Sequence, residues 1–136
     1  MTEGSPRSSV RHVLVADDEP YLGRIVQLKL EQGPYKVSLV GDGREAMERI
    51  EGSDPIDLIL LDIMMPEMTG LEVLSRTRRL EHRRKVPIII LTAKGQESDR
   101  ARALSLGATD FFTKPFSPKK LAARVNELFQ QTGDRA

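Results

Sequence analysis

Short apolar runs alternate with longer segments of helical periodicity along most of this sequence, and this alternation constrains the fold more than any other feature. Apolar runs bounded by turn residues are typical of strands that are buried on both faces. The predicted strands lie at Val13–Ala16, Lys36–Val40, Leu58–Leu61, Pro87–Leu91 and Asp110–Thr113, and a helical pattern follows each of them. Successive strand-helix units of this kind predict an α/β domain with five parallel strands and five helices.

The order of the strands follows from general rules for such domains. Crossovers between parallel strands are right-handed, so the carboxyl ends of all strands gather at one edge of the sheet. For five units the common order is 2-1-3-4-5, and the functional crevice lies at that edge, beside the point where the strand order reverses. We therefore predict a doubly wound α/β sandwich with this strand order.

Length and composition exclude several classes of protein. The chain of 136 residues has the size of one domain, which we place at residues 11–130, with flexible segments at 1–10 and 131–136. It contains no cysteine, which excludes disulfides, thiol nucleophiles and cysteine-ligated zinc. No apolar stretch reaches the roughly 18 residues of a membrane span. We therefore expect a cytoplasmic protein that does not bind membranes. The net charge of +1 argues against direct binding of nucleic acid.

Polar side chains stand where four of the apolar runs end. They are Asp17 with Asp18, Asp62, Thr92 and Lys114. Strands one and three are neighbours in the predicted order, so the three carboxylates converge. Clustered carboxylates repel one another unless a cation joins them, and a set of oxygen ligands favours a hard cation such as Mg²⁺.

The same edge has the groups that phosphoryl transfer needs. A bound Mg²⁺ and the ammonium of Lys114 would offset charge on a phosphoryl group, and the Thr92 hydroxyl can donate to its oxygens. Asp62 lies centrally in the set and is then a carboxylate nucleophile that forms an aspartyl phosphate. Taken singly, the aspartates and Thr92 are explained equally well as helix caps, and Lys114 as a solvated turn residue. The hypothesis rests on their combination.

The motifs resemble those of a known family. Asp17-Asp18, Asp62 with Met65-Pro66 and Gly70, Thr92-Ala93, and Lys114-Pro115-Phe116 are similar to the signature of the response regulator receiver domains of two-component signalling, the CheY-like superfamily. The resemblance covers about residues 11–130. It implies a flavodoxin-like fold in which Asp62 accepts a phosphoryl group from a histidine kinase or a phosphotransfer protein.

The resemblance also implies roles for further groups. Asp18, Asp62 and the backbone carbonyl of Met64 would bind Mg²⁺ directly, and Asp17 would act through water. The peptide bond before Pro115 would be cis.

A conformational switch follows from the same resemblance. Phosphorylation would draw the Thr92 hydroxyl inward and leave space that Phe111 can fill from the surface. This would remodel the face formed by the fourth helix, the fifth strand and the fifth helix. A downstream effector protein, or an output domain absent from this sequence, would read the change. Ordinary core packing of Phe111 remains an equal alternative.

The last helical segment, SPKKLAARVNELF, resembles the corresponding helix in receivers of winged-helix transcriptional regulators. In that group, salt bridges across the switch face join two receivers. Asp110 and Arg124 match one such pair, but Lys120 stands where Arg100 would need an acidic partner, and Leu106 replaces another acid. Like charges oppose that dimer, so at most a weak homodimer is expected.

Three other functions are alternatives to a phosphorylated receiver. A phosphorylation-independent binding module of the same fold is the first alternative. An aspartyl-phosphate phosphatase would need a second aspartate at position 64, where the chain has methionine, and a flavin-binding flavodoxin would find the acidic first loop repulsive. We expect no enzyme in the usual sense, only self-catalysed phosphorylation and dephosphorylation.

The arginine-rich residues 76–85, His82 included, are expected to form a solvated face. Whether the chain is a whole regulator or part of one stays open.

Overall fold

The sheet has the predicted topology. The computed structural model describes residues 10–93 and 98–133, with side chains to residue 130. All strand pairs are parallel, and the strand order is 2-1-3-4-5, which confirms the flavodoxin-like prediction. The strands are β1 (Arg11–Ala16), β2 (Tyr35–Val40), β3 (Leu58–Asp62), β4 (Ile88–Thr92) and β5 (Asp110–Thr113).

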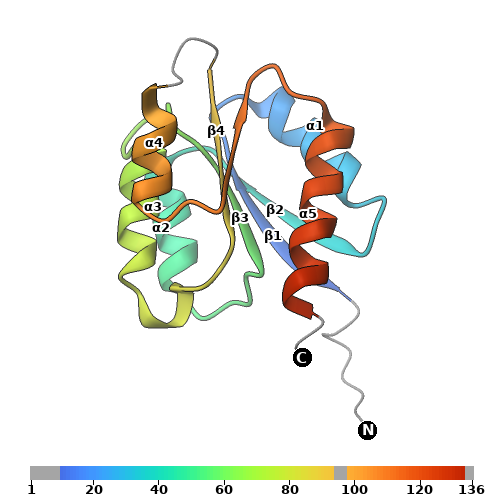
Figure 1. The fold of residues 1–136 in the computed structure, drawn as a ribbon, viewed down its shortest axis with the longest axis horizontal. Coiled ribbons are helices and arrows are strands. Elements are labelled where there is room, and N and C mark those ends of the chain that lie inside the picture. The colour runs from blue at the N-terminus through green and yellow to red at the C-terminus, as the bar shows by residue number, and fades with distance from the viewer. Residues whose placement is uncertain (1–9, 94–97, 134–136) are drawn as a thin grey trace, which may run out of the picture.

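Helices cover both faces of the sheet (Figure 1). On one face lie α1 (Pro20–Leu30) and α5 (Pro118–Gly133). On the other lie α2 (Gly43–Glu51), α3 (Gly70–Arg78) and α4 (Ser98–Ser105), and a 3₁₀ helix, η2 (Glu81–Arg83), precedes β4. Each face has its own apolar core cluster, and every residue of β3 and β4 is buried. Burial on both faces explains why these strands appear in the sequence as unbroken apolar runs.

Local signals fix several helix starts. The Asp42 side chain accepts a hydrogen bond from the Glu45 N–H at the start of α2, at 2.8 Å. Thr69 and Glu72 form a reciprocal capping box at the start of α3. Helix α1 begins at Pro20, and its N-cap residue Glu19 makes no side-chain capping bond. These starts set the loops that follow β1, β2 and β3 at the carboxyl edge of the sheet.

Two side chains, Gln27 of α1 and Glu31 at its C-cap, form hydrogen bonds with the backbone of the outer strand β2 on its free side. The Val37 N–H donates to Glu31 Oε2 at 3.0 Å, and the Val37 carbonyl accepts from Gln27 Nε2 at 3.2 Å. The backbone polar groups of Val37 are therefore satisfied without a further strand.

The arginine-rich segment departs from its prediction at Arg83, which is only 5% exposed. Its Nε donates to the Ile50 carbonyl at 2.9 Å, and its Nη2 donates to the carbonyls of Gly52 and Asp54 at 2.9 and 2.7 Å. The last turn of a helix leaves carbonyls without partners, and a guanidinium group has five donors. Arg83 therefore stabilises the end of α2 instead of facing solvent.

The prediction is also wrong for Arg78. Its Nε donates to the Gly107 carbonyl at 2.9 Å, and its Nη1 donates to the carbonyls of Arg83, Arg84 and Val86 at 3.4, 3.0 and 2.7 Å. One guanidinium thus ties the end of α4 to the segment that leads into β4. Burial lowers the pKa of Arg78 from its usual value.

The other basic side chains of the segment are exposed as expected, namely Arg76, Arg79, Arg84 and Lys85, whereas Thr77 is buried. His82 is exposed too, with Nε2 lying 3.0 Å from the Gly52 carbonyl oxygen.

Some predictions fall outside the described residues. The flexible segment proposed at 1–10 lies almost wholly there. Of the segment proposed at 131–136, only residues 134–136 lie there, because α5 extends to Gly133. The flexibility of both segments stays a prediction. The predicted helical segment after the fourth strand is described at Ser98–Ser105, and residues 94–97 lie outside the described part of the chain.

Within the described part of the chain, no helix has both the length and the apolar character needed to cross a membrane.

Candidate functional site

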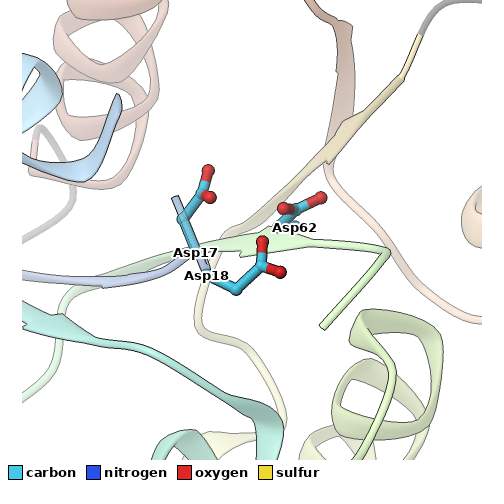
Figure 2. A group of neighbouring side chains, drawn as sticks. All are labelled: Asp17, Asp18 and Asp62. Atoms are coloured by element: carbon cyan, nitrogen blue, oxygen red, sulfur yellow. The ribbon is translucent and has the colours of Figure 1, made fainter. Parts of the chain in front are cut away.

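Three aspartates lie together at the carboxyl edge of the sheet. Asp17 and Asp18 follow β1, and Asp62 ends β3; one carboxylate oxygen of each lies within 4.8 Å of the others (Figure 2). Strand register causes this approach, because Ala16 is aligned with Leu61 and the residue after each is an aspartate. Asp17 and Asp62 are 6% and 4% exposed, whereas Asp18 faces solvent. The sequence prediction placed these carboxylates together correctly.

Lys114 lies directly beside the aspartates. Its Nζ is 3.0 Å from Asp62 Oδ2, 3.2 Å from Asp17 Oδ2 and 2.9 Å from Glu19 Oε1. Thr92 is in register with Thr113, which brings Lys114 to the carboxyl end of β4, and the Lys114 N–H donates to the Thr92 carbonyl at 2.6 Å. One ammonium is therefore shared by three carboxylates.

The other predicted site residues are Pro115, Met64 and Thr92. The peptide bond between Lys114 and Pro115 is cis. The Met64 N–H donates to Asp62 Oδ1 at 3.3 Å, and the Met64 side chain is exposed. The buried Thr92 side chain lies at the end of β4. Metal binding by the Met64 carbonyl remains a prediction.

Burial dominates the electrostatics of Asp62. It raises the pKa of this carboxyl group to about 6, helped by the charge of Asp17 and opposed by Lys114 and the Met64 N–H. For Lys114, burial lowers the pKa, but hydrogen bonds to Glu19 and Asp62 outweigh that effect, so the pKa lies above its usual value. The lysine is therefore a stable cation at neutral pH.

The site lacks enough positive charge for its acids. The ammonium of Lys114 faces Asp17, Asp62 and Glu19, and Asp18 lies close to the first two. Within the described residues, the buried Asp17 Oδ2 accepts no hydrogen bond, although it lies in ion-pair range of Lys114. A donor set made of oxygens with excess negative charge fits a hard divalent cation such as Mg²⁺.

The loop after β3 is held against the strand at Gly70. Its N–H donates to the Ile63 carbonyl at 2.9 Å, and a Cβ at this position would lie 2.3 Å from the Asp62 carbonyl oxygen. Only glycine allows this approach, so the backbone of the central aspartate is fixed by the first residue of α3.

Glu67, in the same loop, has a left-handed backbone with φ of 72°. This conformation costs a residue with a Cβ about 1–2 kcal/mol, while glycine loses about 0.5–1 kcal/mol more entropy on folding. We expect Glu67→Gly to raise the free energy of unfolding by roughly 0.5 kcal/mol, measured by urea denaturation. The matched variant Glu67→Ala keeps the Cβ and should give no gain. Equal stability of the two variants would contradict a strained backbone here.

The predicted switch residue Phe111 is half-buried on β5 and packs against the core cluster under α2, α3 and α4. The guanidinium carbon of Arg100, on α4, lies 5.9 Å from the Phe111 ring centroid. This position is compatible with both core packing and a switch, so the switch role stays a prediction.

Two of the proposed interface residues, Asp110 and Arg124, contact one another within the chain. Arg124 Nε lies 2.5 Å from Asp110 Oδ2, and Nη1 lies 3.1 Å from Glu127 Oε1. The hydrogen bond to Asp110 is the main reason that the pKa of Arg124 is raised. A homodimer through Asp110 and Arg124 would have to share or replace this internal pair.

Sequence reasoning missed Glu19 as a partner of Lys114. The acidic run Asp17-Asp18-Glu19 was a usable signal, but Glu19 stands at the start of a helix, where an acid is normally explained by capping and by the helix dipole.

Comparison with known proteins agrees with this geometry. The family model of the response regulator receiver domain matches residues 13–126. The chain belongs to this family. The receiver domain is 40% identical over 122 residues to the alkaline phosphatase synthesis transcriptional regulatory protein PhoP of Bacillus subtilis, covering 90% of this chain and 50% of PhoP. It is 43% identical over 117 residues to the response regulator SaeR of Staphylococcus aureus, covering 86% of this chain and 50% of SaeR.

Solved structures show the same likeness. The receiver domain of the Francisella response regulator 1452 superposes with a TM-score of 0.80 at 34% identity, covering 90% of this chain and 98% of that one. The receiver domain described here spans about half the length of the curated relatives it matches.

Proposed function

We propose that this receiver domain accepts a phosphoryl group on Asp62 and thereby changes a surface that other proteins recognise. The observation that carries the proposal is the position of Asp62: a buried carboxylate at the sheet edge, 3.0 Å from the Lys114 ammonium and grouped with two further aspartates. Membership of the receiver family supports it.

In the proposed step, a carboxylate oxygen of Asp62 attacks phosphorus. With a phosphohistidine donor, a P–O bond forms to Asp62 and the P–N bond breaks. The electron pair of the P–N bond stays on the imidazole nitrogen, which takes up a proton. Lys114 offsets negative charge on the phosphoryl oxygens, and the Thr92 hydroxyl donates a hydrogen bond to them.

Asp18, Asp62 and the Met64 carbonyl would hold Mg²⁺ directly, with Asp17 acting through water. When bound, Mg²⁺ supplies positive charge that favours the ionised form of Asp62 and offsets charge on the transferred group. The orphaned, buried oxygen of Asp17 supports this assignment.

The proposed partners follow from the chemistry. A histidine kinase or a phosphotransfer protein would supply the phosphoryl group, and an effector protein or a linked output domain would read the result. Movement of Thr92 and Phe111 would carry the change to the face built by α4, β5 and α5. The chemistry is limited to gain and loss of the domain's own phosphoryl group.

Intact-mass analysis after incubation with acetyl phosphate and Mg²⁺ tests the proposal. We expect one added phosphoryl group on the wild type, none on Asp62→Ala, and none when a chelator replaces Mg²⁺. The matched control Asp54→Ala removes an exposed aspartate outside the acidic group and should label normally. An unlabelled wild type would instead favour a phosphorylation-independent binding module.

A further inference from the structure

The side chain of Glu19 is used in an unusual way for a residue at the start of a helix. The Glu19 carbonyl accepts from the Gly23 N–H at 3.1 Å, and the Glu19 N–H donates to Asp17 Oδ1 at 2.8 Å. The carboxylate, however, does not cap α1. It accepts a hydrogen bond from Lys114 Nζ at 2.9 Å, across 95 positions of sequence. The Glu19 carboxylate thus contacts Lys114 instead of capping the first N–H groups of α1.

Glu19 competes with Asp62 for the same ammonium. The two contacts of Lys114 have nearly equal lengths, 2.9 Å to Glu19 and 3.0 Å to Asp62. The Glu19 side chain is 61% exposed, whereas that of Asp62 is 5% exposed. Glu19 therefore holds the ammonium from the solvent side, where a phosphodonor must enter.

Glu19 is also separate from the acids that could bind a cation. The group whose oxygens approach one another within 4.8 Å consists of Asp17, Asp18 and Asp62. Neutralising Glu19 would therefore leave that group intact while freeing Lys114.

We propose that Glu19 is a positioning residue that slows phosphorylation of Asp62. It does so in two ways that act in the same direction. It draws the Lys114 ammonium away from the incoming phosphoryl oxygens, and it places a negative charge in the path of an anionic donor. The inference rests on the proposed function of Asp62 as phosphoacceptor.

The test measures the rate of labelling with acetyl phosphate in excess Mg²⁺ by intact mass. In this reaction the P–O bond to the acetyl group breaks, acetate leaves with its electron pair, and a P–O bond to Asp62 forms. We expect Glu19→Gln to label roughly threefold faster than the wild type, and Glu19→Asp to be intermediate. Glu81→Gln, which removes the same charge from the exposed first residue of η2, should leave the rate unchanged.

A second measurement separates positioning from a structural effect. Nuclear magnetic resonance of the Lys114 ammonium should show a shifted signal and faster hydrogen exchange with water in Glu19→Gln, with an unchanged urea midpoint. A rate at or below that of the wild type, or an unchanged Lys114 signal, would overturn the inference while leaving the phosphoacceptor role standing. A wild type that takes no phosphoryl group would overturn both.

Discussion

Replacing Gly70 with alanine is expected to remove about 3 kcal/mol from the free energy of unfolding, the upper end of the 1–3 kcal/mol that overpacking typically costs, because the neighbouring backbone cannot yield. The added Cβ would lie 2.3 Å from the Asp62 carbonyl oxygen, 2.9 Å from its carbonyl carbon and 3.0 Å from Ile63 Cα. All three atoms belong to the backbone, so no side-chain rotation relieves the clash. Urea denaturation would measure the loss.

The same substitution should impair the phosphorylation that we propose for Asp62 in whatever fraction remains folded, since the clash pushes on the backbone that carries this carboxylate. Gly52→Ala is the matched control. Its Cβ would meet its nearest neighbours at 3.5 and 3.6 Å, which is ordinary contact. We expect a change within about 0.5 kcal/mol there. If Gly70→Ala proved as stable as Gly52→Ala, the close approach of the loop to β3 would be wrong.

Replacing Arg83 with methionine is the second large effect that we expect, again about 3 kcal/mol or more in the free energy of unfolding. Methionine keeps an apolar stem of similar length but removes donors to the carbonyls of Ile50, Gly52 and Asp54. Hydrogen bonds from charged donors contribute about 1.5–3 kcal/mol each, and a buried acceptor left without a partner costs about 1–3 kcal/mol. The expected loss in the free energy of unfolding is less than the sum of these contributions, because water can reach the outer carbonyls.

Arg84→Met is the control for this experiment, because it makes the same chemical change one residue away on an exposed side chain. We expect its unfolding midpoint to stay close to that of the wild type. Arg83→Lys should recover only part of the stability, since a single ammonium cannot match the fork of a guanidinium. Equal midpoints for Arg83→Met and Arg84→Met would show that the three carbonyl contacts contribute nothing.

The sheet and the acidic group could be predicted because both follow from local patterns. The run from Leu58 to Leu61 is buried along its whole length, and this burial is what an unbroken apolar strand requires. Once the strand order is set by the rules for parallel sheets, the residues that follow Ala16 and Leu61 must be neighbours. No long-range detail was needed to place Asp17 beside Asp62.

The contacts of Arg83 could not be predicted, because its partners are distant in sequence. Arg83 and Ile50 are 33 positions apart, and the contact depends on where α2 ends relative to η2. In the sequence, Arg83 and Arg84 are adjacent and identical, yet one is buried and the other exposed. The physical cause is the C-terminal end of α2, whose carbonyls at Ile50 and Gly52 accept hydrogen bonds from Arg83, and these contacts form only once the chain has folded.

Glu19 shows a different limit of sequence reasoning. Its position before Pro20 fits an ordinary helix start, so a local explanation was available and sufficient. Only the arrival of Lys114 from the far end of the domain reveals the other use of its carboxylate.

The contacts of Gln27 and Glu31 with Val37 affect how this domain can associate. An extended peptide that adds to an exposed sheet edge gains its affinity from backbone hydrogen bonds. At β2, such a peptide would first have to displace both side chains from the Val37 backbone. These contacts therefore disfavour edge-to-edge aggregation through β2. A partner protein would bind more readily to the helical faces, where it does not have to displace them.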